Sequence, residues 1–142
     1  MMYEGDAGLD LDLQHVGCYA ESIAIYNPNI TDEEMNAAWE DAKSRGYVNS
    51  SGDLIDPQGL VNILGYPLKF RDGHFPPDTP VDPDTMHIIG EWFNQNNGRT
   101  HFVQMDGKGT DKDNVIYDPI RGGSLTVAEG HFDSYRIFDK VV

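Results

Sequence analysis

The chain holds a single cysteine among its 142 residues, so it cannot form an internal disulfide. This agrees with a reducing compartment. Basic residues are scarce as well, because 10 Lys and Arg face 24 Asp and Glu and leave a formal net charge of −14. Nucleic acids and anionic membranes are bound through clustered Lys and Arg, so neither is an expected partner. The acidity leaves open one function of another class, an inhibitor that mimics nucleic acid, beside the simpler interpretation of a solvated acidic surface.

Long hydrophobic runs are also absent. No stretch approaches the ~20 apolar residues that a membrane span needs. The acidic N-terminal stretch, residues 1–13, lacks the basic start and apolar core of a secretory signal peptide. We therefore expect a cytoplasmic protein without membrane association. The length predicts one domain, residues 1–142, large enough to bury a core without disulfides or a structural metal.

Patterns of metal-ligating or nucleotide-binding residues are missing too. The sequence has one cysteine and no closely spaced pair of histidines, so a zinc site is not expected. Asp106, Asp111 and Asp113 lack the carboxylate order and closing glutamate of a calcium-binding EF-hand loop. The glycines near Lys108 do not form a phosphate-binding loop. The sequence therefore predicts neither a metal nor a cofactor.

The one cysteine, Cys18, directly precedes a helix-competent stretch, residues 19–26. A thiol at a helix start lies near unpaired backbone N–H groups and the positive end of the helix dipole, which favour the nucleophilic thiolate. The alternative is that Cys18 is a small buried apolar residue, which is common for a free cysteine. A catalytic role requires a base and a group that orients it.

Residues 97–119 supply candidates for both. They predict two strands separated by a turn-rich segment, the second stopped by proline. If this hairpin is antiparallel with Met105 opposite Asn114, then His101 lies directly opposite Asp118. Opposed Cβ atoms are about 4.5–5.5 Å apart, which allows a carboxylate to hold one imidazole nitrogen. A shift of one residue would place the two side chains on opposite faces, so the register is a hypothesis.

These positions suit acyl transfer. His101 would take the proton of Cys18, Asp118 would fix the imidazole tautomer, and the amide of Gln14 would donate to the developing oxyanion. His15 is an alternative base. It is three residues from Cys18 along a chain bend, which does not aim it at the sulfur, whereas His101 has an orienting partner.

Four segments resemble papain-like cysteine peptidases, and in particular a bacterial and phage family of predicted peptidases related to the bacteriocin-processing, double-glycine type. They are residues 14–19, His-Phe-Val-Gln from His101, Tyr-Asp-Pro from Tyr117 and Ser-Tyr-Arg-Ile-Phe from Ser134. The resemblance implies that Cys18 is the nucleophile, His101 the base, Asp118 the third member and Gln14 the oxyanion donor. One departure concerns Gln14, because papain-like enzymes usually place this glutamine further before the cysteine than the four positions found here.

The implied activity is hydrolysis of a peptide or isopeptide amide in a peptide or protein substrate, through a thioester on Cys18. Members of such families can keep the fold and lose activity, so a catalytically silent papain-fold binding module stays open as an alternative. The implied fold is α+β, with N-terminal helices packed on a C-terminal antiparallel sheet and the nucleophile at a helix start.

Helix signals are strong in the first half of the chain. Thr31 and Glu34 match a capping box, and a helix from there to Gly46 would bury one face consisting of Met35, Ala38, Trp39 and Ala42. A shorter helix is predicted to begin at Asp56-Pro57, to end at Gly65 and to bury Leu60, Val61 and Leu64.

Extended structure is expected afterwards. Residues 66–70 can run as a strand, and residues 75–84, with four prolines, are expected to form a loop at the rim of a cleft. Residues 86–93 predict a strand that pairs with the His101 strand through a turn at 94–98, and residues 134–138 predict a last strand. Trp92 is expected in the core.

Overall fold

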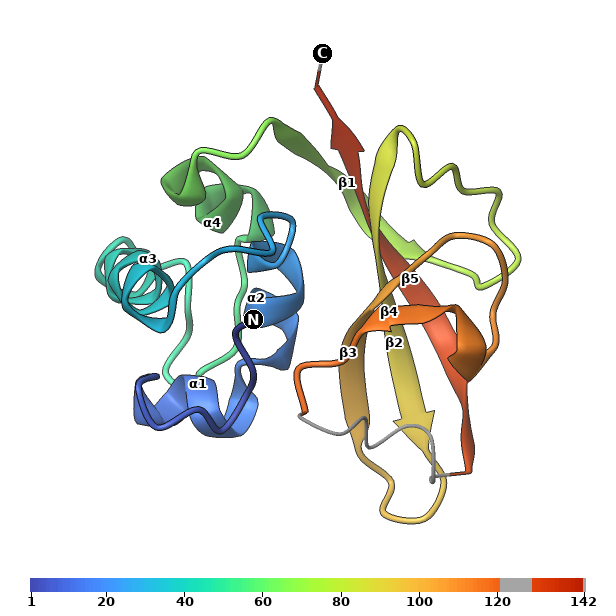
Figure 1. Ribbon diagram of the computed structural model, residues 1–142, viewed down its shortest axis with the longest axis horizontal. Coiled ribbons are helices and arrows are strands. Elements are labelled where there is room, and N and C mark those ends of the chain that lie inside the picture. Colours follow the sequence, from blue (N-terminus) through green and yellow to red (C-terminus); the bar gives the residue numbers. More distant parts are fainter. Residues whose placement is uncertain (121–128, 142) are drawn as a thin grey trace.

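Helices and strands are segregated in this chain, as the sequence predicts. The computed structural model describes residues 1–120 and 129–141, apart from the side chains of His15 and Val16. Its helices are α1 Leu11–Val16, α2 Cys18–Ala24, α3 Asp32–Ser44 and α4 Pro57–Leu64. Its strands are β1 Leu68–Phe75, β2 Met86–Asn94, β3 Thr100–Met105, β4 Val115–Tyr117 and β5 Gly130–Lys140, and a 3-10 helix spans Lys112–Asn114. The helices lie on one side of the sheet, and α2 is the one beside it (Figure 1).

The predicted caps of the two longer helices are confirmed. The Thr31 hydroxyl accepts from the Glu34 N–H at 3.1 Å, and the Glu34 carboxylate accepts from the Thr31 N–H at 3.1 Å. Asp56 accepts from the N–H of Gly59 at 2.9 Å at the start of α4, and Gly65 ends that helix with φ of 73°. The expected core face of α3 is buried and consists of Met35, Ala38, Trp39 and Ala42. Leu60 and Val61 of α4 are buried as well. Leu64, expected in the core, is only half-buried.

The sequence does not predict helix α1, because this helix is short and has no side-chain cap. Tertiary contacts hold it. Leu13 is fully buried, and the carboxylate of Asp12 accepts from the indole N–H of Trp39 on α3 at 2.5 Å. The buried residue and this bond fix α1 against α3, and with it the chain segment that leads to Cys18.

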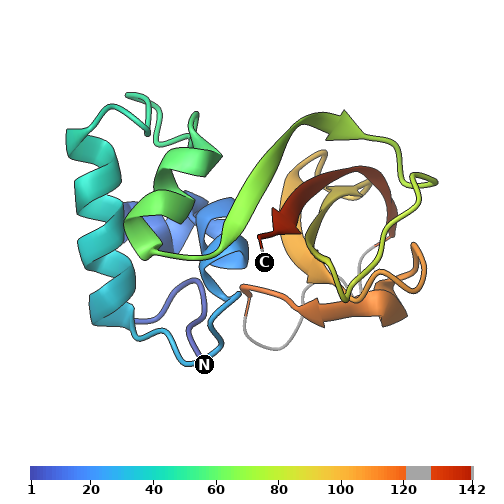
Figure 2. The same cartoon turned by 90° about the horizontal axis from the view of Figure 1, so that it is seen from above.

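The five strands form one antiparallel sheet in the order β1-β5-β2-β3-β4. Figure 2 shows that the sheet is strongly curved. The predicted hairpin of β2 and β3 is confirmed, with Trp92 opposite His101. Strand β5 extends well beyond the expected residues 134–138 and lies between β1 and β2, so it pairs along both of its edges.

The predicted register of the β3–β4 hairpin is wrong. Met105 lies opposite Val115 rather than Asn114, and a bulge then sets Gln104 opposite Tyr117. The reason is local, because Asn114 ends the 3-10 helix and its side chain accepts from the N–H of Asp111 at 3.1 Å. The strand therefore begins one residue later than expected.

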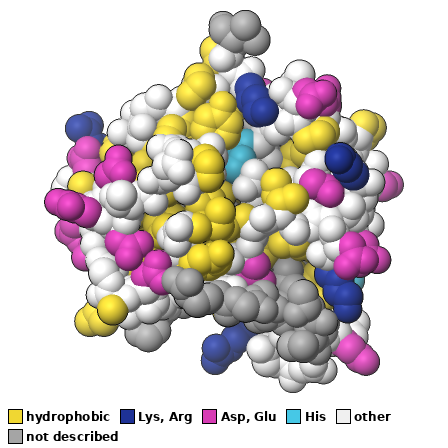
Figure 3. Space-filling view, in the orientation of Figure 1, with side chains coloured by type: hydrophobic (Ala, Val, Ile, Leu, Met, Phe, Trp, Pro, Cys, Tyr) yellow, Lys and Arg dark blue, Asp and Glu magenta, His cyan; other side chains and the backbone are white. Residues whose placement is uncertain are grey.

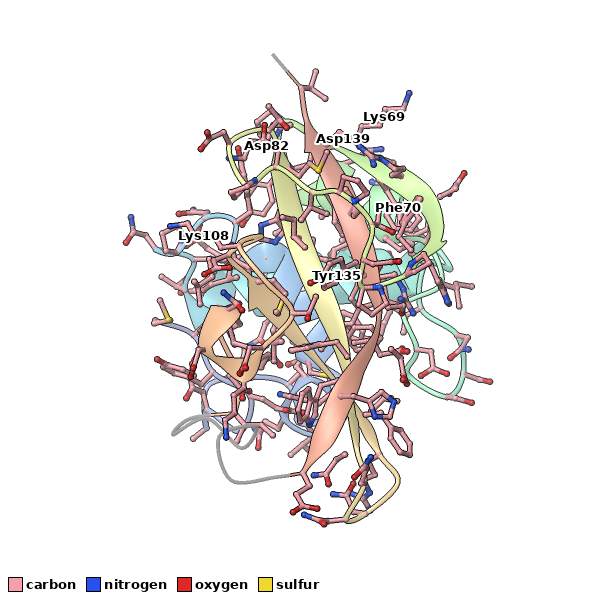
Figure 4. The ribbon with its side chains drawn as sticks, turned by 90° about the vertical axis from the view of Figure 1, so that its right-hand side faces the viewer. Lys69, Phe70, Asp82, Lys108, Tyr135 and Asp139 are labelled. Carbon is pink, nitrogen blue, oxygen red and sulfur yellow. The ribbon has the colours of Figure 1, made fainter. Side chains whose placement is uncertain are left out.

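The sheet separates two apolar clusters. The larger one lies between the sheet and the helices and includes Trp39 and Phe138. The smaller one lies on the outer face of the sheet and contains Ile88, Trp92, Val103, Met105, Phe132, Tyr135 and Ile137. Figure 4 shows Tyr135 on this outer face, near the turn that carries Lys108, and its hydroxyl donates to the carbonyl of Gly109 at 3.3 Å. Trp92 is therefore a core residue, as expected.

The four-proline loop does not have the position expected for it. Val81 packs against the outer cluster, and the ring of Pro83 lies against Gly107. The residues that line the cavity beside Cys18 come from elsewhere in the chain. The loop thus covers the outer face of the sheet and is not a rim of that cavity.

No helix in the described part of the chain combines the length and the apolar character that crossing a membrane requires.

Candidate active site

Cys18 is the first residue of α2 and is partly exposed. Gly17, between α1 and α2, makes this junction possible. A Cβ atom there would lie 2.6 Å from the carbonyl oxygen of Leu13 and 2.6 Å from Oε1 of Glu21, so no larger residue fits without a shift of the backbone. The close approach of the two helices therefore depends on glycine directly before the cysteine.

Cys18 borders a cavity of about 580 Å³, a size typical of ligand sites. Its walls come from both halves of the molecule. The helical half contributes Tyr19, Ala20, Trp39, Gly52, Asp53, Leu54, Ile55 and Pro57, and the sheet contributes Phe70, Gly73, His74, Phe102 and Arg136. The cavity is mostly apolar with a few polar groups, which suits a peptide side chain or backbone.

His101 and Asp118 are in contact, as the sequence predicts. The Nε2–H of His101 donates to Oδ1 of Asp118 at 2.7 Å, and the two side chains are only 13% and 9% exposed. The same carboxylate oxygen accepts from the backbone N–H of Ile120 at 2.9 Å, which holds the carboxylate in place. Continuing the pairing of Gln104 with Tyr117 would set Asp118 opposite Val103, so the contact is diagonal rather than directly across the ladder.

His101 also lies within interaction range of Cys18. Burial works to lower the pKa of His101, but hydrogen bonds to Asp118 and Cys18, together with the charges of both, outweigh it and raise the pKa to about 10. The imidazole is therefore protonated at neutral pH. Because Nε2 is bonded to Asp118, Nδ1 is the ring nitrogen left for the sulfur.

Gln14, the fourth predicted residue, lies on α1. Its side-chain amide donates to the carbonyl of Leu9 at 2.7 Å, which uses one of its two N–H donors. Gln14 is not among the residues that line the cavity beside Cys18. Of the four predicted residues, the contacts shown by the structure join three and do not include Gln14.

Glu21 is a residue near this site that the sequence analysis missed. It is fully buried, and neither carboxyl oxygen has a hydrogen-bond partner among the described residues. Burial, and then the charges of Glu4 and Cys18, raise its pKa to about 9, so it is neutral at pH 7. A signal was present in the sequence, because Glu21 is the only charged residue of an otherwise apolar or small stretch from Ala20 to Ile25.

The remaining histidines have other environments. His87 is buried, with Nε2 2.7 Å from the carbonyl of Ser22 and Nδ1 3.4 Å from the amide of Gln104. Burial lowers its pKa to about 4, so it is a neutral structural residue between β2 and α2. His131 pairs with Asp133 at 2.7 Å. The side chain of His15, the alternative base, lies outside the described part of the structure.

The acidic side chains do not form a continuous ridge on the face shown in Figure 3. Asp and Glu lie there in separate groups toward the two sides, with hydrophobic and uncharged side chains between them. Nucleic-acid mimicry requires carboxylates in a row at phosphate-like spacing. This face does not provide such a row.

Within residues 1–120 and 129–141, no group of three or more His, Cys, Asp or Glu side chains is placed to hold a metal ion. Comparison with known proteins gives no matching family model, no matching curated protein and no matching solved structure.

Proposed function

We propose that the protein is a papain-like cysteine peptidase or amidase that cleaves a peptide or isopeptide amide through a thioester on Cys18. The observation that carries this proposal is the hydrogen-bonded pair of His101 and Asp118 within interaction range of Cys18, which itself lines a cavity of ligand size. Nucleophile, base and orienting carboxylate are the three groups that such acyl transfer requires. The order of helices before an antiparallel sheet, and the resemblance of the sequence to bacterial and phage peptidases, support the same conclusion.

The proposed reaction begins from a thiolate on Cys18 and an imidazolium on His101. The sulfur attacks the carbonyl carbon of the scissile amide, and the carbonyl oxygen becomes an oxyanion. When the C–N bond breaks, His101 transfers its proton from Nδ1 to the leaving amine, which leaves a thioester on Cys18. A water molecule then gives a proton to His101 and attacks the thioester, and the C–S bond breaks to release the acid and restore the ion pair.

Two residues have supporting roles in this proposal. Asp118 holds the Nε2–H of His101, which directs Nδ1 toward the sulfur and stabilises the imidazolium. Gln14 has one amide N–H that is not bonded to Leu9, and this N–H is the proposed side-chain donor to the oxyanion.

Covalent labelling tests the proposal cleanly because the chain contains one cysteine, so each added mass reports Cys18. Native and urea-unfolded protein are treated with iodoacetamide between pH 5 and pH 8, and modification is followed by intact mass. We expect the native wild type to react faster than the unfolded chain near pH 6, and His101→Ala to remove this difference. Equal rates for native and unfolded protein would instead support a catalytically silent binding module.

Turnover is the second part of the test. A mixture of peptides is incubated with the wild type and with Cys18→Ala, and products are identified by mass spectrometry. We expect cleavage by the wild type alone. Products that persist in Cys18→Ala would refute Cys18 as the nucleophile.

A further inference from the structure

One wall of the cavity contains a buried arginine that the proposed reaction does not use. Arg136, on β5, is 5% exposed and lines the same cavity as Cys18. Its guanidinium donates to the hydroxyl of Ser134 at 2.6 Å and to one oxygen of Glu91 at 3.2 Å, and it lies 5.4 Å from the centre of the Phe102 ring. The guanidinium makes one hydrogen bond to Glu91 rather than a bidentate pair. Among the described residues, some of its five N–H donors are therefore without an acceptor.

A second donor lies in the same wall. Tyr19 stacks on Phe102 with ring centres 4.7 Å apart, and its buried hydroxyl has no hydrogen-bond partner among the described residues. Burial raises the pKa of Tyr19, so the hydroxyl keeps its proton, and the charge of Arg136 acts on this group as well. A buried hydroxyl without a partner is unusual in proteins, and because Tyr19 lines the cavity, a ligand acceptor that displaces the atoms covering this hydroxyl would satisfy it.

We propose that Tyr19 and Arg136 form a subsite for a carboxylate group of the substrate. This inference rests on the proposed function and narrows its substrate class. The guanidinium would repel a cationic group of the substrate. A carboxylate, by contrast, has oxygens that can accept from both the hydroxyl and the unused guanidinium N–H groups. The ring of Phe102 packs against both residues and adds apolar surface to this wall, and hydrogen bonds to a charged acceptor are stronger in such surroundings.

The position of the subsite limits where the carboxylate lies in the substrate. Cys18 and Tyr19 are consecutive residues of α2 and both line the cavity. A group bound by Tyr19 therefore belongs to the residue at the cleaved bond or to its immediate neighbour. It is either the side chain of an acidic residue or the terminal carboxylate of a short peptide.

The test compares peptidyl acyloxymethyl ketones, which alkylate a reactive cysteine, and measures the second-order rate of Cys18 modification by intact mass. One set differs only at the residue next to the reactive carbon, as Glu, Gln, Leu or Lys. The other set carries the same reactive ketone on a side chain, so that each short peptide can end in a free carboxylate or in a carboxamide. We expect a preference of about tenfold or more for the carboxylate in one of the two sets, and the set that shows it identifies the source.

The ratio of the Glu to the Gln rate, or of the free acid to the amide rate, is measured within each variant, so that changes in thiol reactivity cancel. Tyr19→Phe removes only the unpaired hydroxyl, and we expect the ratio to fall severalfold. Arg136→Gln combined with Glu91→Gln removes both charges together, leaves no lone buried carboxylate, and should bring the ratio to about one. Tyr135→Phe is the matched control, because it deletes a hydroxyl from the residue directly before Arg136, which lies on the outer face of the sheet, and it should leave the ratio unchanged.

Binding of the same peptides, without the reactive group, to Cys18→Ala separates this inference from the proposed function. A carboxylate preference in binding, with no accelerated labelling of the wild type, would refute the peptidase and retain the subsite. The subsite would be overturned if Glu, Gln and Leu probes, and acid and amide probes, gave equal labelling rates and equal binding. A preference for Lys would also overturn it, as would a carboxylate preference that is unchanged when Arg136→Gln and Glu91→Gln are combined.

Discussion

His101 and Asp118 meet through a diagonal contact across two strands, with Nε2 2.7 Å from Oδ1, although the ladder between β3 and β4 does not set them opposite each other. The bulge between Val115 and Tyr117 and the bond from Ile120 to Asp118 fix the carboxylate in this position. The function of the pair therefore depends on the geometry at the end of β4 as well as on the two residues themselves.

The first prediction concerns Asp118. Asp118→Asn keeps an oxygen that accepts from the Nε2–H of His101, so we expect kcat/KM to fall by about tenfold, whereas Asp118→Ala should lower it by roughly 10²-fold or more. The measurement is steady-state hydrolysis of the best peptide found in the turnover screen. Cys18→Ala, with no activity, sets the baseline. Equal losses for Asn and Ala would contradict an orienting role.

The second prediction concerns His101 and stability. Its pKa is raised to about 10 in the folded protein, against about 6.5 in an unfolded chain. The favourable contribution of the protonated imidazole is therefore complete below pH 6.5 and is lost as the pH rises from 6.5 to 10. We expect the free energy of unfolding of the wild type, measured with urea, to fall relative to that of His101→Gln as the pH rises from 6.5 to 10. A difference that is constant from pH 6 to pH 10 would show that the imidazole does not hold a raised pKa.

The third prediction concerns the buried carboxyl group of Glu21. Its folded pKa of about 9 lies above the ordinary value of 4.5, so the folded state keeps a proton that the unfolded state releases, and stability falls as the pH rises between these values. We expect Glu21→Gln to be more stable than the wild type at pH 8, with a gain that grows by up to about 1.4 kcal/mol per pH unit. Glu33→Gln, at an exposed position of α3, is the matched control and should show no such trend.

The fourth prediction concerns acid sensitivity. His87 is neutral when folded, with a pKa of about 4 against an unfolded value near 6.5, so the unfolded state binds more protons between these values and stability falls as the pH drops from 6.5 to 4. His87→Gln can still donate to the carbonyl of Ser22. We expect this variant to be less stable by about 1–3 kcal/mol at pH 7, because the packing of the ring is lost, and to lose less stability than the wild type on acidification. Thermal unfolding at pH 4.5 and pH 7 measures both effects, and equal acid sensitivity of the two proteins would contradict the assignment.

Local signals predicted much of the helical half. The capping box of Thr31 and Glu34, the Asp56 cap and Gly65 are each satisfied by neighbours within a few residues, so the sequence alone contains the relevant information. The hairpin turn at 94–98 is similar, because both strands lie directly beside it. The contact of His101 with Asp118 was also predictable, since the two residues are close in sequence and have complementary chemistry.

The remaining features depend on partners that are distant in the sequence. Asn114 has a strand-like neighbourhood, yet its side chain caps a 3-10 turn and changes the hairpin register. Glu21 stands out locally as a charge in an apolar stretch, but its full burial depends on how α2 packs in the fold. Arg136 becomes part of the cavity only because β5 enters the middle of the sheet, which no local pattern around it indicates.

The central position of β5 has a consequence for biosynthesis. Strands β1 and β2 follow each other in the chain but do not pair, and β5 is the strand that joins them. Until residues 130–140 have left the ribosome, the helices with β1 and the β2–β4 segment have no shared ladder, and the wall that carries Arg136 does not exist. The thiol of Cys18 is translated more than a hundred residues earlier, so a nascent chain would carry the proposed nucleophile without a complete cavity. Completion of the sheet would thus delay the proposed hydrolysis until residues 130–140 have been synthesised.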